Sequence, residues 1–398
     1  MVTGAGIITA LGAGWKPNAE GFRTGRVAFS PVSLFDVSRQ RVKTAAQVNL
    51  PHALPQTQLS QRQATRLDRA GAMLIHAARE AWDQAGWAPV EDLPLVLGTT
   101  SGGMTLGEAY FRQALRAPRQ LRHQPTRVLH YQAQTQARMV HGALGSNGPI
   151  TIVSNACASG ANAIGHAWKI IRRGQAQRVL CGGYDALCEL VFGGFDSLQA
   201  LSPTTCRPFD AGRNGLALGE GAAILALETL ESAHGRGAAI LGEFAGYGET
   251  IDIHHLTQPH PEGDAALTAM TRACETARLT PADIDYVNAH GTGTPLNDSA
   301  EAHALRRWAG DRVRTLPVSS TKAGVGHLLG GAGAVEAAVC LMALAGQWLP
   351  PELAFEEPDP ICAFPIVQRP QEAKLKTALS NSFGFGGVNA ALIFRRWE

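Results

Sequence analysis

The chain has 398 residues, 45% of them hydrophobic, and a formal net charge of +2. A chain of this size can bury a large core, and so small a net charge gives no electrostatic basis for binding nucleic acid. Its seven cysteines include no Cys-x-x-Cys pair, which argues against a disulfide framework and a zinc site and favours a reducing, cytoplasmic compartment.

The N-terminal residues and the hydropathy pattern predict a soluble protein. Residues 1–8 carry no basic segment of the kind that opens a signal peptide, and they have the pattern of a strand that enters a core. No apolar run reaches the length expected of a membrane span, so we expect no membrane association.

Apolar periodicity predicts alternating strands and helices along the chain. In the first part we expect strands at 2–11, 93–100, 150–153, 178–183 and 222–227, and helices at 68–85, at 128–144 and from 160 onward. From about residue 240 we expect helices at 265–278, 298–309 and 331–346, strands at 284–288 and 316–319, and two closing strands. This alternation predicts an α/β fold with a largely parallel sheet. Residues 149–172 and 315–346 each combine a strand, a turn and a small-residue helix, which indicates a duplicated unit.

Cys157 is the candidate nucleophile, because it lies at a tight junction between the strand at 150–153 and the helix that follows. At such a junction the unpaired N–H groups and the positive end of the helix dipole can stabilise a thiolate and bind an oxyanion. A buried cysteine is ordinarily a packing residue, but packing requires no such placement.

Two histidines lie at comparable junctions in the second half of the chain. His290 follows a predicted strand within residues 288–298, and His327 lies within residues 322–336, where a strand again meets a helix. Ligands of parallel sheets bind beyond the carboxyl ends of the strands. We therefore expect Cys157, His290 and His327 to form one catalytic site.

Together with residues 380–389, Ser-Asn-Ser-Phe-Gly-Phe-Gly-Gly-Val-Asn, these segments resemble the beta-ketoacyl-acyl carrier protein synthases, and most of all the elongating type. The resemblance extends from Val2 to Phe394. It implies a thiolase-like fold, with duplicated βαβαβαββ halves in a layered α-β-α-β-α arrangement. The halves would be residues 1–240, which carry the cysteine, and residues 241–398, which carry the histidines. The family needs no cofactor and no metal.

The resemblance implies a decarboxylative Claisen condensation. Cys157 would take an acyl group from acyl carrier protein as a thioester. His290 and His327, as neutral imidazoles with Nε2–H donors, would bind the malonyl thioester carbonyl and stabilise the enolate. The backbone N–H groups of Cys157 and Phe385 would form a second oxyanion hole, and Phe385 would also act as a gate between the malonyl and acyl sites.

The remaining site residues also follow from the resemblance. Lys322 and Glu336 match a supporting charged pair. The positions implied for substrate binding are Thr292 and Thr294 on the pantetheine arm, Ser101 and Gln132 at the acyl pocket, and Phe195 and Phe383. Gln132 would reach the pocket of a neighbouring subunit. Arg62 and Arg66 match basic residues that dock the acidic carrier protein, although they also fit a solvated helix start.

Several positions differ from the family pattern. Asn214 replaces the usual Asp, Val388 the usual Thr and Leu328 another Thr, and the loop at 201–206 is short. These differences favour a specialised synthase of a secondary lipid or polyketide pathway, which would work either as a homodimer or as a heterodimer with a related chain-length-factor-like subunit.

Two alternatives come from other classes of protein. A non-catalytic chain-length-type subunit would lack the nucleophile, so the presence of Cys157, His290 and His327 argues against it. A papain-like Cys/His hydrolase would require neither the second histidine nor a resemblance along the whole chain.

Overall fold

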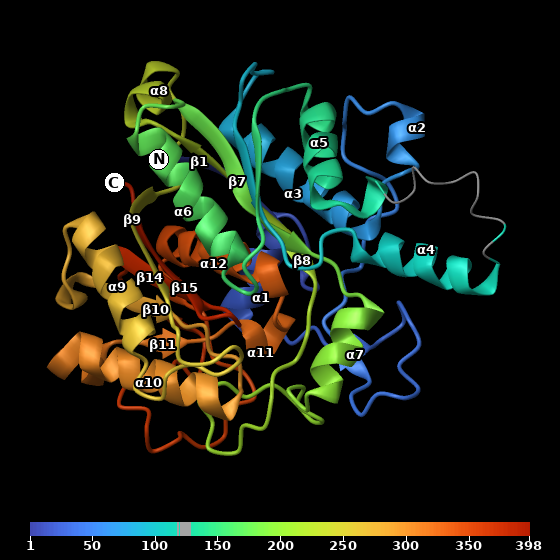
Figure 1. Ribbon diagram of the computed structural model, residues 1–398. Helices are drawn as coiled ribbons and strands as arrows, with labels where there is room; N and C mark the ends of the chain where they lie inside the picture. The colour runs from blue at the N-terminus through green and yellow to red at the C-terminus, as the bar shows by residue number, and fades with distance from the viewer. Residues whose placement is uncertain (118, 120–128) are drawn as a thin grey trace.

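The computed structural model describes residues 1–117, 119 and 129–398, and it contains two large β-sheets with helices between and outside them (Figure 1). The first half of the chain forms one sheet and the second half forms the other, so that each half has the same layered construction. Figure 1 also shows the two chain termini close to each other, at the same side of the molecule.

The first sheet has six strands in the order β2-β1-β8-β7-β5-β6. Strands β1, β8 and β7 pair antiparallel, whereas β7, β5 and β6 pair parallel. The strands are β1 (Val2–Thr9), β2 (Gly12–Ala13), β5 (Leu95–Gly98), β6 (Ile150–Val153), β7 (Arg178–Asp185) and β8 (Gly221–Glu228). The segment with Cys157 therefore follows β6, the strand at one edge of this sheet.

The second sheet has five strands in the order β11-β10-β14-β15-β9, and its pairing repeats that of the first. Strands β9, β15 and β14 pair antiparallel, and β14, β10 and β11 pair parallel. The strands are β9 (Glu243–Ile251), β10 (Tyr286–Asn288), β11 (Val318–Ser319), β14 (Thr377–Phe383) and β15 (Val388–Arg395). The matching orders β1-β8-β7-β5-β6 and β9-β15-β14-β10-β11 confirm the predicted duplication.

The prediction of largely parallel sheets was wrong, because both sheets are mixed. A parallel pair needs a long crossover connection, usually a helix. Residues 384–387, which join β14 to β15, form only a short turn, so these two strands have to run antiparallel.

Three layers of helices enclose the two sheets. The first sheet is covered on its outer face by α3 (Arg69–Ala85) and α5 (Ala133–Leu144), and the second by α9 (Asp264–Ala277) and α10 (Pro295–Ala309). The equivalent helices α6 (Ser159–Arg172) and α12 (Ala332–Gly346) pack against each other between the sheets (Figure 1). This gives the predicted α-β-α-β-α order of a thiolase-like fold.

Shorter elements connect these layers. The helices are α1 (Trp15–Thr24), α2 (Gln61–Ala64), α4 (Met104–Arg116), α7 (Glu189–Ser197), α8 (Leu230–Gly235) and α11 (Lys322–Val325). The remaining strands are β3 (Ser30–Pro31), β4 (Thr44–Ala45), β12 (Trp348–Leu349) and β13 (Gln371–Glu372). Neither α4 nor α7 was predicted from the sequence.

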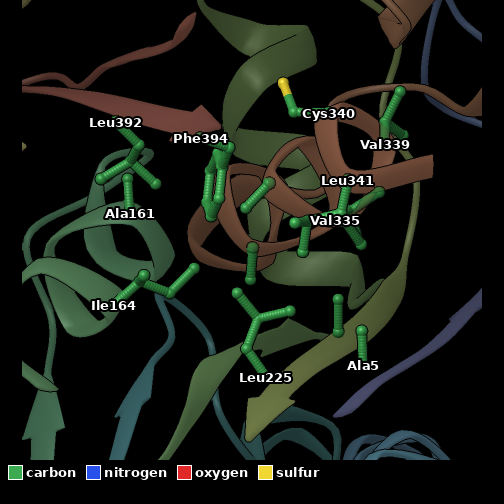
Figure 2. Close-up of a cluster of buried hydrophobic side chains, with 14 of the residues drawn as sticks. Ala5, Ala161, Ile164, Leu225, Val335, Val339, Cys340, Leu341, Leu392 and Phe394 are labelled. Carbon is green, nitrogen blue, oxygen red and sulfur yellow. The ribbon is translucent and has the colours of Figure 1, made fainter. Parts of the chain in front are cut away.

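The core between the sheets is built from both halves of the chain. Figure 2 shows Ala161 and Ile164 of α6 in the same cluster as Val335 and Leu341 of α12 and Phe394 of β15, all of them buried. Small residues on both helices let the helices and strands approach closely. Because α6 follows Cys157 and α12 follows His327, this core fixes the two junctions relative to each other.

One described segment, Leu329–Gly346, is long and apolar enough to cross a membrane, with a mean hydropathy of 1.7. This corrects the prediction that no run reaches such a length. The segment consists mainly of α12, and 89% of it is buried inside the protein. Its apolar surface is therefore covered by the two sheets and by α6, as expected of a central core helix.

Candidate active site

The turn that carries Cys157 joins the last residue of β6, Val153, to the first residue of α6, Ser159. Ala156 has a φ of 56°, in the left-handed region that residues with a Cβ rarely adopt. The Ser159 hydroxyl stabilises this turn by accepting the Asn155 N–H at 2.9 Å and donating to the Ala156 carbonyl at 2.5 Å. The turn directs Cys157, which is 8% exposed, into a cavity of ≈ 350 Å³.

The protonation state of Cys157 differs from the sequence-based expectation of a stabilised thiolate. Burial raises the pKa of the Cys157 thiol to about 11, although the Lys322 charge and the Phe385 N–H lower it. The carboxylates of Asp185 and Glu336 raise it slightly further. Desolvation therefore outweighs the favourable donors at the helix end, and the resting nucleophile is a thiol.

His290 and His327 line the same cavity as Cys157. His290 comes shortly after β10, and His327 follows α11 through Gly326, whose φ of 74° turns the chain sharply. The two imidazole rings are 5.3 Å apart between centroids and nearly perpendicular, at 82°. The three residues that the sequence placed at strand ends thus lie around one cavity.

Hydrogen bonds determine which nitrogen of each imidazole carries the proton. His327 Nδ1 accepts the Leu329 N–H at 3.2 Å, and His290 Nδ1 lies 3.4 Å from the Lys322 ammonium, which has only donors. Burial lowers the pKa of both histidines well below the usual value, and the positive charge of Lys322 lowers both further. Both rings are therefore neutral with a proton on Nε2, the tautomer that the sequence-based mechanism requires.

Lys322 and Glu336 form an ion pair beneath His290 in which both residues are almost fully buried. Lys322 Nζ also donates to the His290 carbonyl at 2.6 Å. Glu336 belongs to α12, so the pair ties the histidine loop to the central core. A buried charge requires such a partner, because removing it from water without one is costly.

Glu352 is a second buried carboxyl near Lys322, and the sequence did not single it out. Its Oε2 accepts the Ser320 N–H at 2.6 Å, and Ser320 Oγ in turn accepts the Lys322 N–H at 3.3 Å and donates to the Gly291 carbonyl at 2.7 Å. Burial raises the pKa of Glu352 well above its usual value. Glu352 follows two prolines and belongs to no motif, so nothing in the sequence pointed to this support of the segment that carries Lys322.

Two carboxylates of α10 support the loop that contains His290. Glu301 accepts the N–H groups of His290 at 2.9 Å and Gly291 at 2.8 Å, and Asp298 accepts those of Thr292 at 3.0 Å and Gly293 at 3.1 Å. Asp and Glu are rarely buried, so their residue type gave no sign of this role in the sequence. No group of three or more His, Cys, Asp or Glu among the described residues is arranged to hold a metal ion.

Aromatic residues line the cavity beside the nucleophile. Phe385, which is 41% exposed, stacks on Phe195 with ring centroids 6.0 Å apart. Phe383 packs against His290 at 5.7 Å. Gly384 packs tightly against the nucleophile, because a Cβ there would lie 3.2 Å from the Cys157 nitrogen. The Phe385 N–H bonds to the Cys157 thiol, which places it next to the reacting sulfur.

Thr292 and Thr294 also line this cavity, with their hydroxyl oxygens 2.8 Å apart. The other predicted residues lie elsewhere. Ser101 is buried, and its hydroxyl donates to Asp185 at 2.7 Å. Gln132 precedes α5 and accepts a hydrogen bond from Gln134 at 2.8 Å. Arg62 of α2 and the nearby Arg66 are exposed, and neither lines the described cavity.

Comparison with known proteins agrees with this geometry, because the chain matches one enzyme family along most of its length. The chain matches the models of the beta-ketoacyl synthase N-terminal domain over residues 1–233 and C-terminal domain over residues 241–356. It is 37% identical to the 3-oxoacyl-[acyl-carrier-protein] synthase 2 of Synechocystis sp., covering 100% of this chain and 98% of that protein.

Solved structures show the same similarity. The ishigamide ketosynthase/chain length factor superposes with a TM-score of 0.94 at 33% identity, covering 100% of this chain and 98% of that one. A ketosynthase bound to the hexaketide, in complex with its type II PKS acyl-carrier protein, superposes with a TM-score of 0.87 at 26% identity, covering 100% and 98%.

Proposed function

This chain belongs to the beta-ketoacyl synthase family, and we propose that it is a beta-ketoacyl-[acyl carrier protein] synthase. The reaction is the decarboxylative Claisen condensation of an acyl group held on Cys157 with malonyl-acyl carrier protein, in fatty acid or polyketide-type chain elongation. The observation that carries the proposal is that Cys157 and two neutral Nε2–H imidazoles, His290 and His327, line one cavity.

The first half-reaction transfers the acyl group to Cys157. The sulfur attacks the thioester carbonyl of the acyl carrier protein, the new C–S bond forms as the old one breaks, and the thiol proton passes to the departing pantetheine sulfur. In this proposal the Cys157 and Phe385 N–H groups bind the oxyanion of the tetrahedral intermediate, and the effect of the Phe385 N–H on the Cys157 thiol supports this. Because the resting sulfur is a thiol, its proton has to leave during the attack.

The second half-reaction breaks the bond between the malonyl carboxylate and the α-carbon. Carbon dioxide leaves, and the electron pair moves onto the thioester oxygen, where the Nε2–H groups of His290 and His327 stabilise the enolate. The enolate carbon then attacks the acyl thioester on Cys157. A C–C bond forms, the Cys157 thiolate departs and is reprotonated, and β-ketoacyl-acyl carrier protein is released.

A dimer of this chain, or a heterodimer with a related subunit, fits the exposed edge of the first sheet. Strand β6 lies at that edge, and α4 contains no buried residue and exposes Phe111 at 63% and Leu115 at 69%. We also propose that residues 1–240 and 241–398 are the two units of the duplicated fold, and that this soluble enzyme works in the cytoplasm.

A second candidate function is that of a specialised ketosynthase subunit paired with a chain-length-factor-like partner. The TM-score of 0.94 to the ishigamide ketosynthase/chain length factor favours it. The two candidates differ in whether the purified chain alone condenses octanoyl- and malonyl-acyl carrier protein. Condensation by the chain alone supports the homodimer, whereas condensation only after addition of a related subunit supports the heterodimer.

The test of the proposed function is acylation of the nucleophile. Wild-type protein incubated with octanoyl-acyl carrier protein should gain one octanoyl mass in intact-protein mass spectrometry. Cys157→Ala should gain none, while its circular dichroism spectrum and melting temperature stay close to those of the wild type. A Cys157→Ala protein that is acylated at the wild-type rate would contradict the assignment of the nucleophile.

A further inference from the structure

The buried residue Glu352 belongs to a segment that is bonded to strand β11. Its N–H donates to the Val367 carbonyl at 2.6 Å, and the Val367 N–H donates to the Val318 carbonyl of β11 at 3.1 Å. The Ser319 hydroxyl, at the end of the same strand, donates to the Pro350 carbonyl at 2.6 Å. These contacts fix Glu352 relative to the chain that leaves β11 and enters α11.

A series of hydrogen bonds joins Glu352 to the loop that carries His290. Glu352 Oε2 accepts the Ser320 N–H at 2.6 Å. The Ser320 hydroxyl donates to the Gly291 carbonyl at 2.7 Å and accepts the Lys322 N–H at 3.3 Å. Lys322 Nζ in turn donates to the His290 carbonyl at 2.6 Å and lies 3.4 Å from His290 Nδ1. Through Ser320, Glu352 therefore contacts both the backbone next to His290 and the segment of the cation beside the imidazole ring.

The hydrogen bonds of Glu352 are those of a neutral carboxylic acid. The two buried carboxylates of α10, Glu301 and Asp298, each accept three or more N–H groups. Glu352 Oε2 accepts the Ser320 N–H, whereas Glu352 Oε1 is buried and has no hydrogen-bond partner in the described part of the chain. An unpaired buried hydroxyl is much less costly than an unpaired buried charge, so this arrangement suits the protonated form.

The charges around Glu352 favour the same protonated form. Burial raises the pKa of Glu352 well above its usual value and the Asp298 carboxylate raises it further, whereas the neighbouring backbone N–H groups and the Lys322 charge only partly offset this rise. Lys322 is already paired with Glu336, so an ionised Glu352 would have to share that cation. The charged or titratable groups that face Glu352 are Asp298 of α10, Lys322 of α11, Tyr286 of β10, Cys206 and Cys362.

We propose that Glu352 is a positioning residue of the decarboxylation step, and that it acts as a neutral hydrogen-bonding group and not as a counter-charge to Lys322. This inference rests on the proposed function. Glu352 does not line the cavity that contains Cys157. It acts through Ser320, whose hydroxyl holds the loop of His290 and so positions the His290 Nε2–H for the thioester oxygen of malonyl-acyl carrier protein. Acylation of Cys157 uses backbone donors and should depend much less on Glu352.

The test compares variants of this hydrogen-bond series in the two half-reactions. Glu352→Ala and Ser320→Ala each remove one link, and Glu357→Ala, which changes an exposed glutamate of the same segment, is the matched control. Glu352→Ala and Ser320→Ala should each lower carbon dioxide release from malonyl-acyl carrier protein about tenfold, because His290 loses its exact placement. Acylation of Cys157 by octanoyl-acyl carrier protein should change less than about twofold. Glu352→Gln should rescue decarboxylation, because its amide oxygen can still accept the Ser320 N–H.

The pH profile of decarboxylation distinguishes a neutral Glu352 from a counter-charge. A neutral Glu352 predicts that the wild type and Glu352→Gln have superimposable profiles from about pH 6 to about pH 9. An ionised Glu352 would raise the pKa of the nearby imidazoles, so its replacement by glutamine would move the profile to lower pH. Such a shift would overturn the proposed neutral role, as would a loss in Glu352→Gln as large as that in Glu352→Ala.

The outcomes separate this inference from the proposed function. A wild-type protein that neither takes an acyl group on Cys157 nor releases carbon dioxide from malonyl-acyl carrier protein overturns the proposed function itself. An active wild type with unchanged decarboxylation in Glu352→Ala and Ser320→Ala overturns the role of Glu352 alone, as does an equal loss in both half-reactions or in Glu357→Ala. Circular dichroism checks the fold of each variant. If Glu352→Ala does not fold, Ser320→Ala and the pH profile of Glu352→Gln decide the question.

Discussion

The pH dependence of Cys157 reactivity is the most direct consequence of its burial. With a pKa of about 11, the fraction of thiolate at pH 7.5 is about 1 in 3,000, whereas an ordinary cysteine with a pKa of about 8.5 is about one-tenth ionised. Alkylation of Cys157 by iodoacetamide should therefore be about 300-fold slower than that of free cysteine at this pH. The rate should rise about tenfold per pH unit from pH 7 to pH 10, because thiolate is still scarce throughout that range.

The assay is peptide-resolved mass spectrometry of iodoacetamide-treated enzyme without substrate, with free cysteine as the reference in the same buffers. Circular dichroism at each pH checks that the fold persists. A rate that reaches a plateau below pH 8 would refute the reasoning, because it would mean that the helix end and Lys322 stabilise the thiolate more than burial opposes it.

Two further predictions concern catalysis and substrate choice. His290→Ala and His327→Ala should each lower malonyl-acyl carrier protein decarboxylation by about 10²–10³-fold, because each removes one oxyanion donor, while acylation of Cys157 changes much less. Carbon dioxide release measures decarboxylation, and intact-protein mass spectrometry measures acylation. Equal losses in both steps would contradict the separation of roles. We expect Gln132 to contact the polar, aryl or unsaturated end of an acyl group in the neighbouring subunit's pocket. Gln132→Leu should then shift preference towards saturated acyl chains, because burying the Gln132 amide unpaired against such a chain costs about 1–3 kcal/mol. Acylation rates across chains of equal length and different terminal polarity measure this, and an unchanged preference for long saturated chains would exclude Gln132 from the pocket.

The duplicated architecture was predictable from the sequence, because strands and helices alternate with clear apolar periodicity in both halves. The strand directions could not be predicted, because apolar periodicity carries no information on which strands pair or in which direction. Helix α4 was not predicted, for a related reason. None of its residues is buried, so its apolar positions do not form a face that packs on the core.

The three chemical groups of the site were predictable because each lies in a short turn near a predicted strand end, although the structure adds α11 between β11 and His327. Their supporting residues were less so. Glu301 and Glu352 stabilise the site by accepting backbone N–H groups of residues outside their own elements, and such pairings appear only once the chain is folded. The sequence also indicated the helix end, which favours a thiolate at Cys157, but not the completeness of burial, which raises the pKa of the thiol.

Burial has opposite consequences for the two kinds of group in this site. It keeps His290 and His327 neutral, as donors to an enolate must be, but it also keeps Cys157 protonated and less nucleophilic. The charge of Lys322 favours the useful form of all three, since it lowers the pKa of both imidazoles and of the thiol. Glu336 offsets part of that effect on the thiol, yet without it the buried ammonium would lack a counter-charge. The ion pair at the centre of the fold is thus better explained as a means of setting protonation states than as a source of stability.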